Sequence, residues 1–343
     1  MVLAVDVVIH FLWLIGGLAL LYYGADWLVD GASRIALKLG ISPLVVGLTV
    51  VAFGTSMPEL LVCLKANSPE LLVKPAEWLG VKFVTKGGSS DIALGNIVGS
   101  NIFNVALILG VAALIRPVVI HSQLIRREMP ILILCSAVFL MMMADMVIQQ
   151  WEGWVLIAGI LFYVVSSVLL AKRAKNTKEF ETEYDESDLV GWKAKMWCNL
   201  ALCLVGILAL VLGAHLLVDH GEALARIFGV PEVIISLTLF ALGTSLPELA
   251  TTVVASLKKQ GDIITGNAIG SCIFNLMAVM GVTAGVEKLE GKHIAWLDLG
   301  VMMGVTLLIM PFMWTNMRLG RREGAVMVTI ALVYSVMVVM MQR

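Results

Sequence analysis

The chain has 343 residues, of which 59% are hydrophobic and only 14% are charged, whereas soluble domains are about a quarter charged. This composition predicts an all-α integral membrane protein. The net charge is −1 and the sequence has no basic tract, and we expect no nucleic acid as a partner. The cysteines show no metal-ligand spacing, so we expect small core residues at Cys63, Cys135, Cys198, Cys203 and Cys272.

Ten stretches are long and apolar enough to cross a bilayer as helices. They run roughly over residues 7–29, 43–64, 92–115, 129–148, 154–171, 196–218, 233–257, 263–286, 294–314 and 325–341. A charged segment after the fifth stretch predicts an aqueous linker. We therefore expect an N-terminal membrane repeat at residues 1–173, a cytoplasmic linker at 174–195 and a C-terminal membrane repeat at 196–343.

The charges between the stretches predict their orientation. The first Lys or Arg is Arg34, so the basic start of a cleavable signal peptide is missing, and we expect the first stretch to be a retained helix. Most of the 24 Lys and Arg residues fall on the side of the linker if both termini lie outside. The sequence thus predicts both termini outside the cytoplasm. The charged triplet at 126–128 is interpreted as a cytoplasmic anchor.

The two halves of the chain repeat each other. Gly-Thr-Ser-Met-Pro-Glu-Leu at 54–60 returns 189 residues later as Gly-Thr-Ser-Leu-Pro-Glu-Leu at 243–249. The segment 91–104 returns 171 residues later, with nine of its 14 positions identical. The first half therefore carries 18 additional residues within 67–90, for which we expect a short surface helix on the bilayer or, as the alternative, a regulatory lid.

Each half has five predicted spans, which is an odd number. Two homologous halves of this kind must cross the membrane in opposite directions, so the sequence predicts an inverted-topology repeat. Such architectures place a binding site near the bilayer midplane, where the halves meet.

Both copies of the first motif predict a broken helix. Pro58 and Pro247 lack the N–H that would bond the carbonyl oxygens of Gly54 and Gly243, four residues earlier. We expect ring clashes to open the turns around Ala52, Phe53, Ala241 and Leu242. Broken helices are tolerated at membrane depth only where protein or a polar cavity surrounds them, so the loose carbonyls should point inward.

The polar residues of the motifs predict a cation site built from oxygen atoms. Thr55 and Glu59 lie four residues apart on one helical face, as do Thr244 and Glu248. The same spacing joins Ser100 to Asn104 and Ser271 to Asn275. A calcium ion takes six to eight such oxygen ligands. Two glutamates neutralise one divalent ion or two monovalent ions, which is the requirement of an exchanger.

Small and acidic residues nearby have simpler interpretations. Gly95 with Gly99 and Gly266 with Gly270 predict close packing between helices. Asp91 and Asp262 lie at expected helix starts, where a carboxylate caps free N–H groups; a charge in the vestibule is the alternative.

Two long motifs resemble a known family. The Gly-Thr-Ser-x-Pro-Glu segments at 54–59 and 243–248 are each followed by Gly-Asn-x-x-Gly-Ser-x-Ile-Phe-Asn. They resemble the two alpha-repeats of the calcium/cation antiporter superfamily, and most closely bacterial sodium/calcium exchanger-type inner-membrane proteins. The resemblance covers nearly the whole chain. It implies ten transmembrane helices in two inverted five-helix repeats, and alternating access by sliding of the first and sixth helices.

The resemblance also implies the ligands of each ion. Calcium would bind Glu59, Glu248 and backbone oxygens of Thr55 and Thr244. Sodium would draw on Ala52, Thr55, Ser56, Glu59, Ser100, Asn104, Ala241, Thr244, Ser245, Glu248, Ser271 and Asn275. Some relatives, including potassium-dependent ones, carry aspartate where this chain has Asn275, which leaves potassium coupling open. Cys272 stands where the first repeat has Asn101 and is expected to face away from the ions.

The function predicted from these features is secondary active antiport of calcium against sodium in a bacterial inner membrane. We expect no enzyme activity, no cofactor and no obligate protein partner, only the transported ions and membrane lipid. Proton/calcium exchange is the nearest alternative, because buried glutamates can carry protons. A cation channel is less favoured, since no loop resembles a selectivity filter. An intramembrane hydrolase is disfavoured because the histidines lie in or beside expected loops or near a terminus: His10, His121, His215, His220 and His293.

Overall fold

The computed structural model describes residues 2–68, 90–173, 191, 195–230, 243–292 and 294–341, and it is almost entirely helical. The described elements of the first half are α1 (Val2–Leu39), α2 (Pro43–Val46), η1 (Gly47–Val51), α3 (Ala52–Thr55), α4 (Met57–Asn67), α6 (Ser90–Ile102), η2 (Phe103–Ile108), α7 (Leu109–Ile115), β1 (Val118–Val119), η3 (Leu124–Glu128), α8 (Met129–Met142), η4 (Met143–Asp145), β2 (Val147–Ile148) and α9 (Gln150–Arg173). Those of the second half are α10 (Met196–Ile227), α12 (Leu246–Leu257), α13 (Gly261–Phe274), η9 (Asn275–Val279), α14 (Met280–Val286), β3 (Leu289–Glu290), α15 (Trp296–Trp314), η10 (Thr315–Met317), β4 (Arg318–Leu319) and α16 (Arg321–Met341).

The structure is consistent with the ten spans that the sequence predicts, but fewer of the described helices meet the length and hydropathy that a span requires. Seven helices of the described residues are long and apolar enough to cross a membrane. An eighth span is a broken pair, Pro43–Thr55 and Met57–Asn67, bent by 41°. The other two expected spans correspond to α16 and to α12, which is described as a shorter apolar helix.

Two of the helices extend well beyond their predicted ends. α1 continues to Leu39 and α10 to Ile227, so Asp30 and Asp219, which follow the predicted ends, lie within helices. The charges are accommodated because each pairs with a residue one turn away. Arg34 contacts Asp30 at 3.2 Å, and His215 contacts Asp219 at 3.2 Å.

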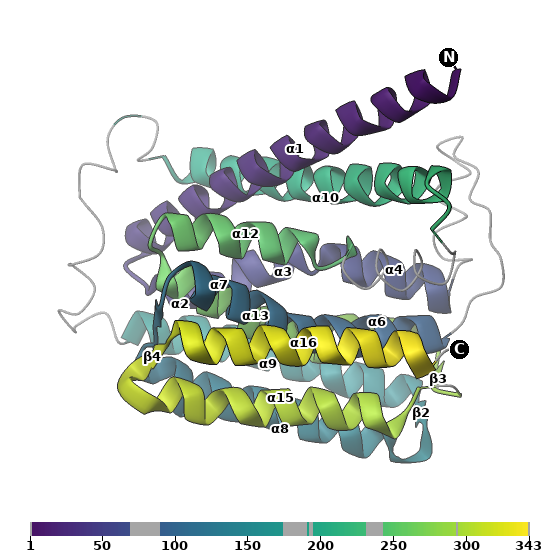
Figure 1. Cartoon of the computed structure of the whole chain (residues 1–343). Helices are drawn as coiled ribbons and strands as arrows, with labels where there is room; N and C mark the ends of the chain where they lie inside the picture. The colour runs from purple at the N-terminus through teal and green to yellow at the C-terminus, as the bar shows by residue number, and fades with distance from the viewer. Residues whose placement is uncertain are drawn as a thin grey trace.

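Two small sheets confirm that the halves are inverted. β1 pairs with β4, placing Val118 opposite Leu319, and β2 pairs with β3, placing Val147 opposite Glu290. Each strand of the second half lies 171 residues after its counterpart, so the two sheets are copies of one pairing. β4 lies at one end of the molecule, whereas β2 and β3 lie at the other (Figure 1). Both chain termini lie near the end that carries β2 and β3, as an even number of crossings requires.

The first helices of the two repeats form a separate layer. α1 and α10 pack along each other at one side of the bundle (Figure 1). Glycines at the crossing allow the backbones to touch: a Cβ on Gly17 would lie 3.0 Å from the carbonyl oxygen of Gly213, and one on Gly24 would lie 2.9 Å from that of Gly206. This layer rests on the remaining helices mainly through α12.

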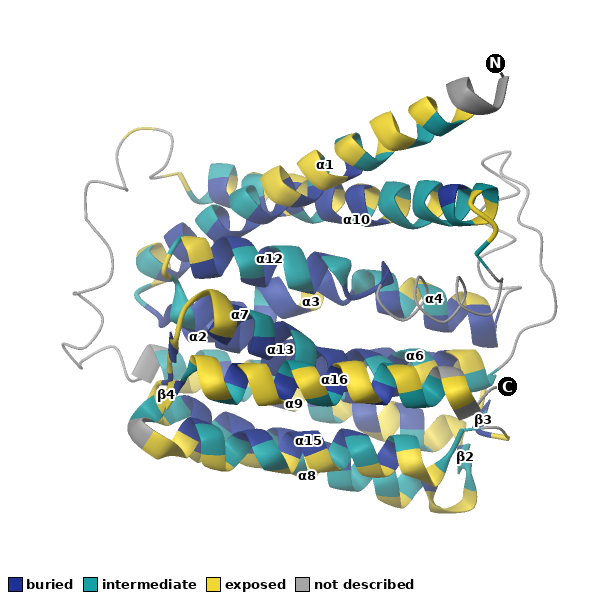
Figure 2. Cartoon of the chain, viewed as in Figure 1, coloured by how far each residue is buried: buried dark blue, intermediate teal, exposed yellow. Residues whose placement is uncertain are grey.

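The pattern of burial is that of a multi-pass membrane protein. Every residue of α13 from Asp262 to Phe274 is buried, which places this helix in the centre (Figure 2). The outer faces of peripheral helices expose large apolar side chains instead, such as Phe162 on α9. Five exposed tryptophans of the described residues lie near helix ends, as an interfacial belt requires: Trp151, Trp154, Trp197, Trp296 and Trp314. The exposed Trp13 lies within α1 instead. The predictions for the additional segment and for the linker fall mostly on 69–89 and 174–194, which lie almost wholly outside the described residues.

Candidate functional site

The two proline motifs break their helices at equivalent residues. α3 ends at Thr55, and Ser56 leaves the helical conformation with φ −84° and ψ 5° before α4 begins. Ser245 has nearly the same backbone, φ −89° and ψ 5°, before α12. The prediction of a break is confirmed, but its expected position at Ala52 and Phe53 is wrong. The turn there survives because the N–H of Ser56 still bonds the carbonyl of Ala52 at 3.0 Å. Ala241 and Leu242 lie outside the described residues.

The breaks position two fully buried carboxylates. Glu59 and Glu248 occupy the first turns of α4 and α12, and neither is exposed. Ser100 donates a hydrogen bond to Oε1 of Glu59 at 3.3 Å. Ser56 donates to Oε1 of Glu248 at 3.4 Å, across the boundary between the repeats. The Oε2 atom of each glutamate has no hydrogen-bond partner among the described residues. Each carboxylate thus offers a free oxygen in the centre of the molecule.

Hydroxyl groups connect the two halves around these carboxylates. Ser100 lies 3.1 Å from Ser245, measured between the Oγ atoms. Thr55 Oγ1 lies 3.3 Å from Ser271 Oγ, and Ser271 donates to Glu248 at 3.5 Å. The structure therefore brings together most of the residues that the sequence predicted for the site: Thr55, Ser56, Glu59, Ser100, Thr244, Ser245, Glu248 and Ser271.

Asn104 and Asn275 lie at equivalent distortions of their helices. Asn104 is in the π-helical turn η2 and Asn275 begins the π-helical turn η9. Both side chains are fully buried, and their amide nitrogen and oxygen atoms have no partner in the described part of the chain. Turns of this kind occur frequently at functional sites, because the extra residue redirects a side chain. Two amides that are ready to bind are therefore held at matching positions.

Two further asparagines belong to the same polar cluster, although the sequence analysis did not select them. Thr55 donates to Oδ1 of Asn267, and Thr244 donates to Oδ1 of Asn96, each at 3.1 Å. Both bonds cross between repeats, and each is the copy of the other. The repeated Gly-Asn step of the motif was the available signal, since an amide recurs there in both halves.

A third buried carboxylate lies apart from the site. Glu128 was predicted as part of a cytoplasmic anchor, but it is fully buried. Its Oε2 atom accepts a hydrogen bond from Tyr163 at 2.9 Å, and Arg127 lies 3.7 Å from Oε1. These partners explain its burial, and they make Glu128 part of the contact between α9 and the start of α8.

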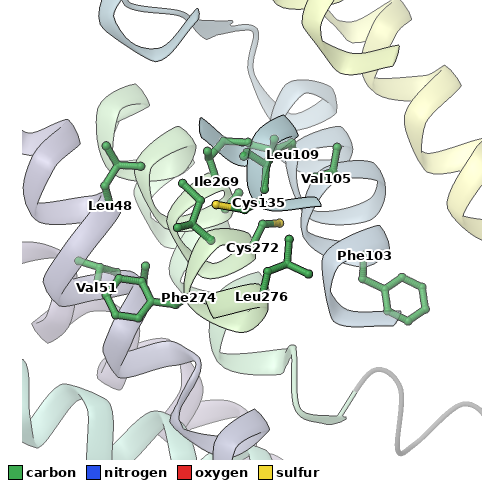
Figure 3. Packing of buried hydrophobic residues seen from close by; sticks show 14 of the residues in the cluster. Leu48, Val51, Phe103, Val105, Leu109, Cys135, Ile269, Cys272, Phe274 and Leu276 are labelled. Carbon is green, nitrogen blue, oxygen red and sulfur yellow. The ribbon is translucent and has the colours of Figure 1, made fainter. Parts of the chain in front are cut away.

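The close helix packing that the sequence predicted is observed in the second repeat. Cβ atoms on Gly266 and Gly270 would meet backbone atoms of α2 and η1 at 2.7–2.8 Å, so the prediction of close packing is confirmed there. The equivalent partners of Gly95 and Gly99 would lie at 233–241, outside the described residues. Cys272 lies in an apolar cluster with Leu276 (Figure 3). Its Sγ atom also lies 3.8 Å from the carbonyl oxygen of Asn101.

Asp262, in the first turn of α13, has side-chain partners beyond the helix cap that the sequence predicted. Asp262 accepts a hydrogen bond from Ser42 at 3.3 Å and lies 3.1 Å from Nε2 of His121. Ser42 is itself the N-cap of α2. Asp262 therefore joins three segments at one end of the bundle.

Comparison with known proteins agrees with this geometry. The family described as sodium/calcium exchanger protein matches residues 9–169 and 199–340, which is most of both repeats. The chain belongs to this family. It is 37% identical over 309 residues to the putative antiporter CaxA of Alkalimonas amylolytica, covering 89% of each chain. It is 35% identical over 308 residues to the inner membrane protein YrbG of Escherichia coli, covering 88% of this chain and 87% of that one.

A solved structure of the sodium-calcium exchanger NCX_Mj superposes with a TM-score of 0.74 at 27% identity. The superposition covers 95% of this chain and 98% of that one. The protein is thus a membrane transporter of the cation antiporter class with the fold of this exchanger, as the two motifs predicted.

Proposed function

We propose that this member of the exchanger family moves calcium in one direction and sodium in the other through a single site formed by Glu59 and Glu248. The observation that carries the proposal is the burial of both carboxylates at the breaks of two repeat-related helices, each with one oxygen that accepts no hydrogen bond from the described residues. Calcium would bind these oxygens together with backbone oxygens of Thr55 and Thr244. Sodium would use the same carboxylates with the surrounding hydroxyls and amides.

The charge balance supports exchange rather than one-way flow. Two ionised carboxylates far from water are costly unless cations neutralise them, so the site favours being loaded whenever it crosses the membrane. One calcium ion and two sodium ions satisfy the same two charges. Alternate loading by these ions therefore couples their movements. The exchanger is proposed to work in a bacterial inner membrane, with both termini outside and with no resident cofactor.

Reconstitution in liposomes tests the coupling. Vesicles containing the protein are loaded with sodium and diluted into sodium-free medium that contains radioactive calcium. We expect calcium uptake that disappears when internal and external sodium are equal. Uptake driven by an imposed pH gradient in the absence of sodium would replace sodium by protons as the coupling ion. Calcium flux that needs no counter-ion gradient would contradict antiport altogether.

A further inference from the structure

We propose that ions travel between the site and one end of the molecule along the polar face of the α12–α13 hairpin, past Thr252, Ser256 and Asn267. This inference rests on the proposed function, because the route leads to the same carboxylates. It assigns a role to Thr252 and Ser256, two buried polar residues that lie outside both repeat motifs.

The hairpin aligns polar residues in successive pairs. Ser271 of α13 bonds Glu248 of α12 at 3.5 Å, which fixes the register of the two antiparallel helices. One helical turn further from the site, the same register places Thr252 beside Asn267. The next turn brings Ser256 to the first turn of α13, which contains Asp262. These positions form a column that starts at the site carboxylate and ends at the end of the bundle that carries the Lys258–Gln260 turn.

The hydroxyls of this column lack the bonds that buried hydroxyls normally make. Thr265, Thr283 and Thr306 each donate to the carbonyl oxygen one turn earlier in their own helix, at 3.1, 2.7 and 2.8 Å. Thr252 and Ser256 are just as buried, but their hydroxyls have no hydrogen-bond partner among the described residues.

The neighbouring atoms share this property. Nδ2 of Asn267 and Oγ1 of Thr251 also lack partners in the described part of the chain. A buried polar group without a partner costs about 1–3 kcal/mol, so we expect water or a hydrated ion to satisfy these four groups of one hairpin. The three hydroxyl oxygens can replace part of the shell of a hydrated cation, and Nδ2 of Asn267 can donate to a water of that shell.

The equivalent positions of the first repeat also form a column, but there the side chains make hydrogen bonds with one another. Ser100 bonds Glu59 at 3.3 Å, the amide of Asn96 contacts Sγ of Cys63 at 3.6 Å, and Ser90 bonds Asn67 at 2.7 Å. The residues of the first repeat that correspond to Thr252, Asn267 and Ser256 are therefore hydrogen-bonded, whereas atoms of these three residues have no partner among the described residues. The contrast means that the missing bonds are a property of one side of the molecule and not of the motif.

The end of the column that is farther from the two glutamates lies close to the solvent-exposed surface. Asp262 is buried, but its partner His121 is about half exposed and lies 3.1 Å away. The carboxylate of Asp262 would attract a cation to this end of the route, and the half-exposed imidazole of His121 lies at the surface of the protein.

Accessibility of single cysteines tests the route directly. Thr252→Cys and Ser256→Cys are prepared in the full-length protein and treated with a small, permanently charged methanethiosulfonate in sodium, in calcium and with neither ion. Mass spectrometry of peptides identifies the modified residue. We expect both positions to react about tenfold faster than the controls in at least one condition, and calcium to slow the reaction at position 252.

The chain supplies two matched controls. Val254→Cys places a thiol at the same depth of α12 but on another, equally buried face. The native Cys63 is the copy of position 252 in the first repeat and is buried. Rates at positions 252 and 256 that equal those of both controls would overturn the proposal.

A second variant removes the hydroxyls without a bulky reagent. Thr252→Val combined with Ser256→Ala should lower the calcium exchange rate about threefold or more while equilibrium calcium affinity changes less than about twofold, because the carboxylates stay in place. An unchanged exchange rate would contradict the route. If the native chain shows no sodium-driven calcium uptake but positions 252 and 256 react rapidly, the coupling proposal fails while the route stands.

Discussion

At the scale of single residues, the decisive feature is that Glu59 and Glu248 are both buried and occupy equivalent positions in the two repeats. Neither has a Lys or Arg ion-pair partner among the described residues, unlike Glu128, which lies beside Arg127. A buried carboxylate without a fixed counter-charge needs a mobile one. We therefore expect the two negative charges to contribute more to cation affinity than the exact geometry of the ligands does.

Replacing either glutamate by glutamine tests this expectation. Glu59→Gln and Glu248→Gln keep the shape of the side chain but remove one of two charges, so calcium affinity should fall by about 3–5 kcal/mol, a hundredfold or more. Isothermal titration in detergent measures the affinity. Glu128→Gln is the matched control, because it neutralises a buried carboxylate elsewhere and should leave calcium affinity unchanged. Native affinity in either site variant would contradict a shared site.

The threonine–asparagine bonds between repeats can be tested as a pair. Thr244→Val leaves Oδ1 of Asn96 without a donor, so we expect a loss of about 1–3 kcal/mol in stability. Combining it with Asn96→Leu removes the unsatisfied acceptor too, and the double variant should lose less than the sum of the two single changes. Thermal unfolding in detergent measures this coupling, and Thr244→Ser should restore the bond. Additive losses would show that the contact contributes nothing.

At the scale of elements, the sequence predicts what depends on local chemistry. Pro58 lacks an N–H wherever it lies, so a broken helix followed from its identity alone. The repeat offset likewise predicted that α12 and α4 are copies. The π-helical turns at Asn104 and Asn275 were not predicted, because they depend on packing between helices and not on propensity.

The ends of helices were the weakest part of the prediction for a related reason. Charged residues such as Asp30 suggested that α1 leaves the membrane at 29, yet the helix continues to Leu39. Its charge is compensated by Arg34 on the same helix and by Lys258, which is far away in sequence. Tertiary partners of this kind cannot be seen in a single sequence. The same reason explains why Asn96 and Asn267 were overlooked, since their threonine partners come from the other repeat.

The contact of Lys258 with α1 leads to a prediction at this scale. Its ammonium group lies 2.6 Å from Asp26 and also contacts Asp30, so it ties the α12–α13 turn to the first helix. Lys258→Met leaves two neighbouring aspartates on α1, and we expect a loss of about 1–2 kcal/mol of stability, with the pairs discounted for partial exposure. Lys259→Met is the control on the adjacent, exposed residue. Melting temperatures in detergent should fall for the first variant only; equal values would show that the contact does not hold α1.

At the scale of the whole molecule, the repeat determines which contacts occur twice. The sheet of β1 and β4 returns as that of β3 and β2 at the opposite end, and the break at Ser56 returns at Ser245. The two polar columns also lie at equivalent positions, but the residues corresponding to Thr252 and Ser256 are hydrogen-bonded in the first repeat, whereas these two hydroxyls have no partner among the described residues. The architecture is therefore nearly symmetric in backbone and asymmetric in its polar contacts, which is what two distinct routes to one site require.

The packing of α1 against α10 gives a prediction for the molecule as a whole, because this pair forms one layer and contacts the rest along one face. A Cβ on Gly206 would lie 2.7 Å from the carbonyl oxygen of Gly24 and 2.8 Å from the backbone nitrogen of Leu28. Gly206→Ala must therefore push the two helices apart, at a cost of about 1–3 kcal/mol. Gly16→Ala is the matched control, since a Cβ there meets no described atom within 4 Å. We expect the melting temperature and the calcium exchange rate of Gly206→Ala to fall together, while both stay at native values in Gly16→Ala. A stable Gly206→Ala protein with native exchange would mean that the two helices do not need this close approach.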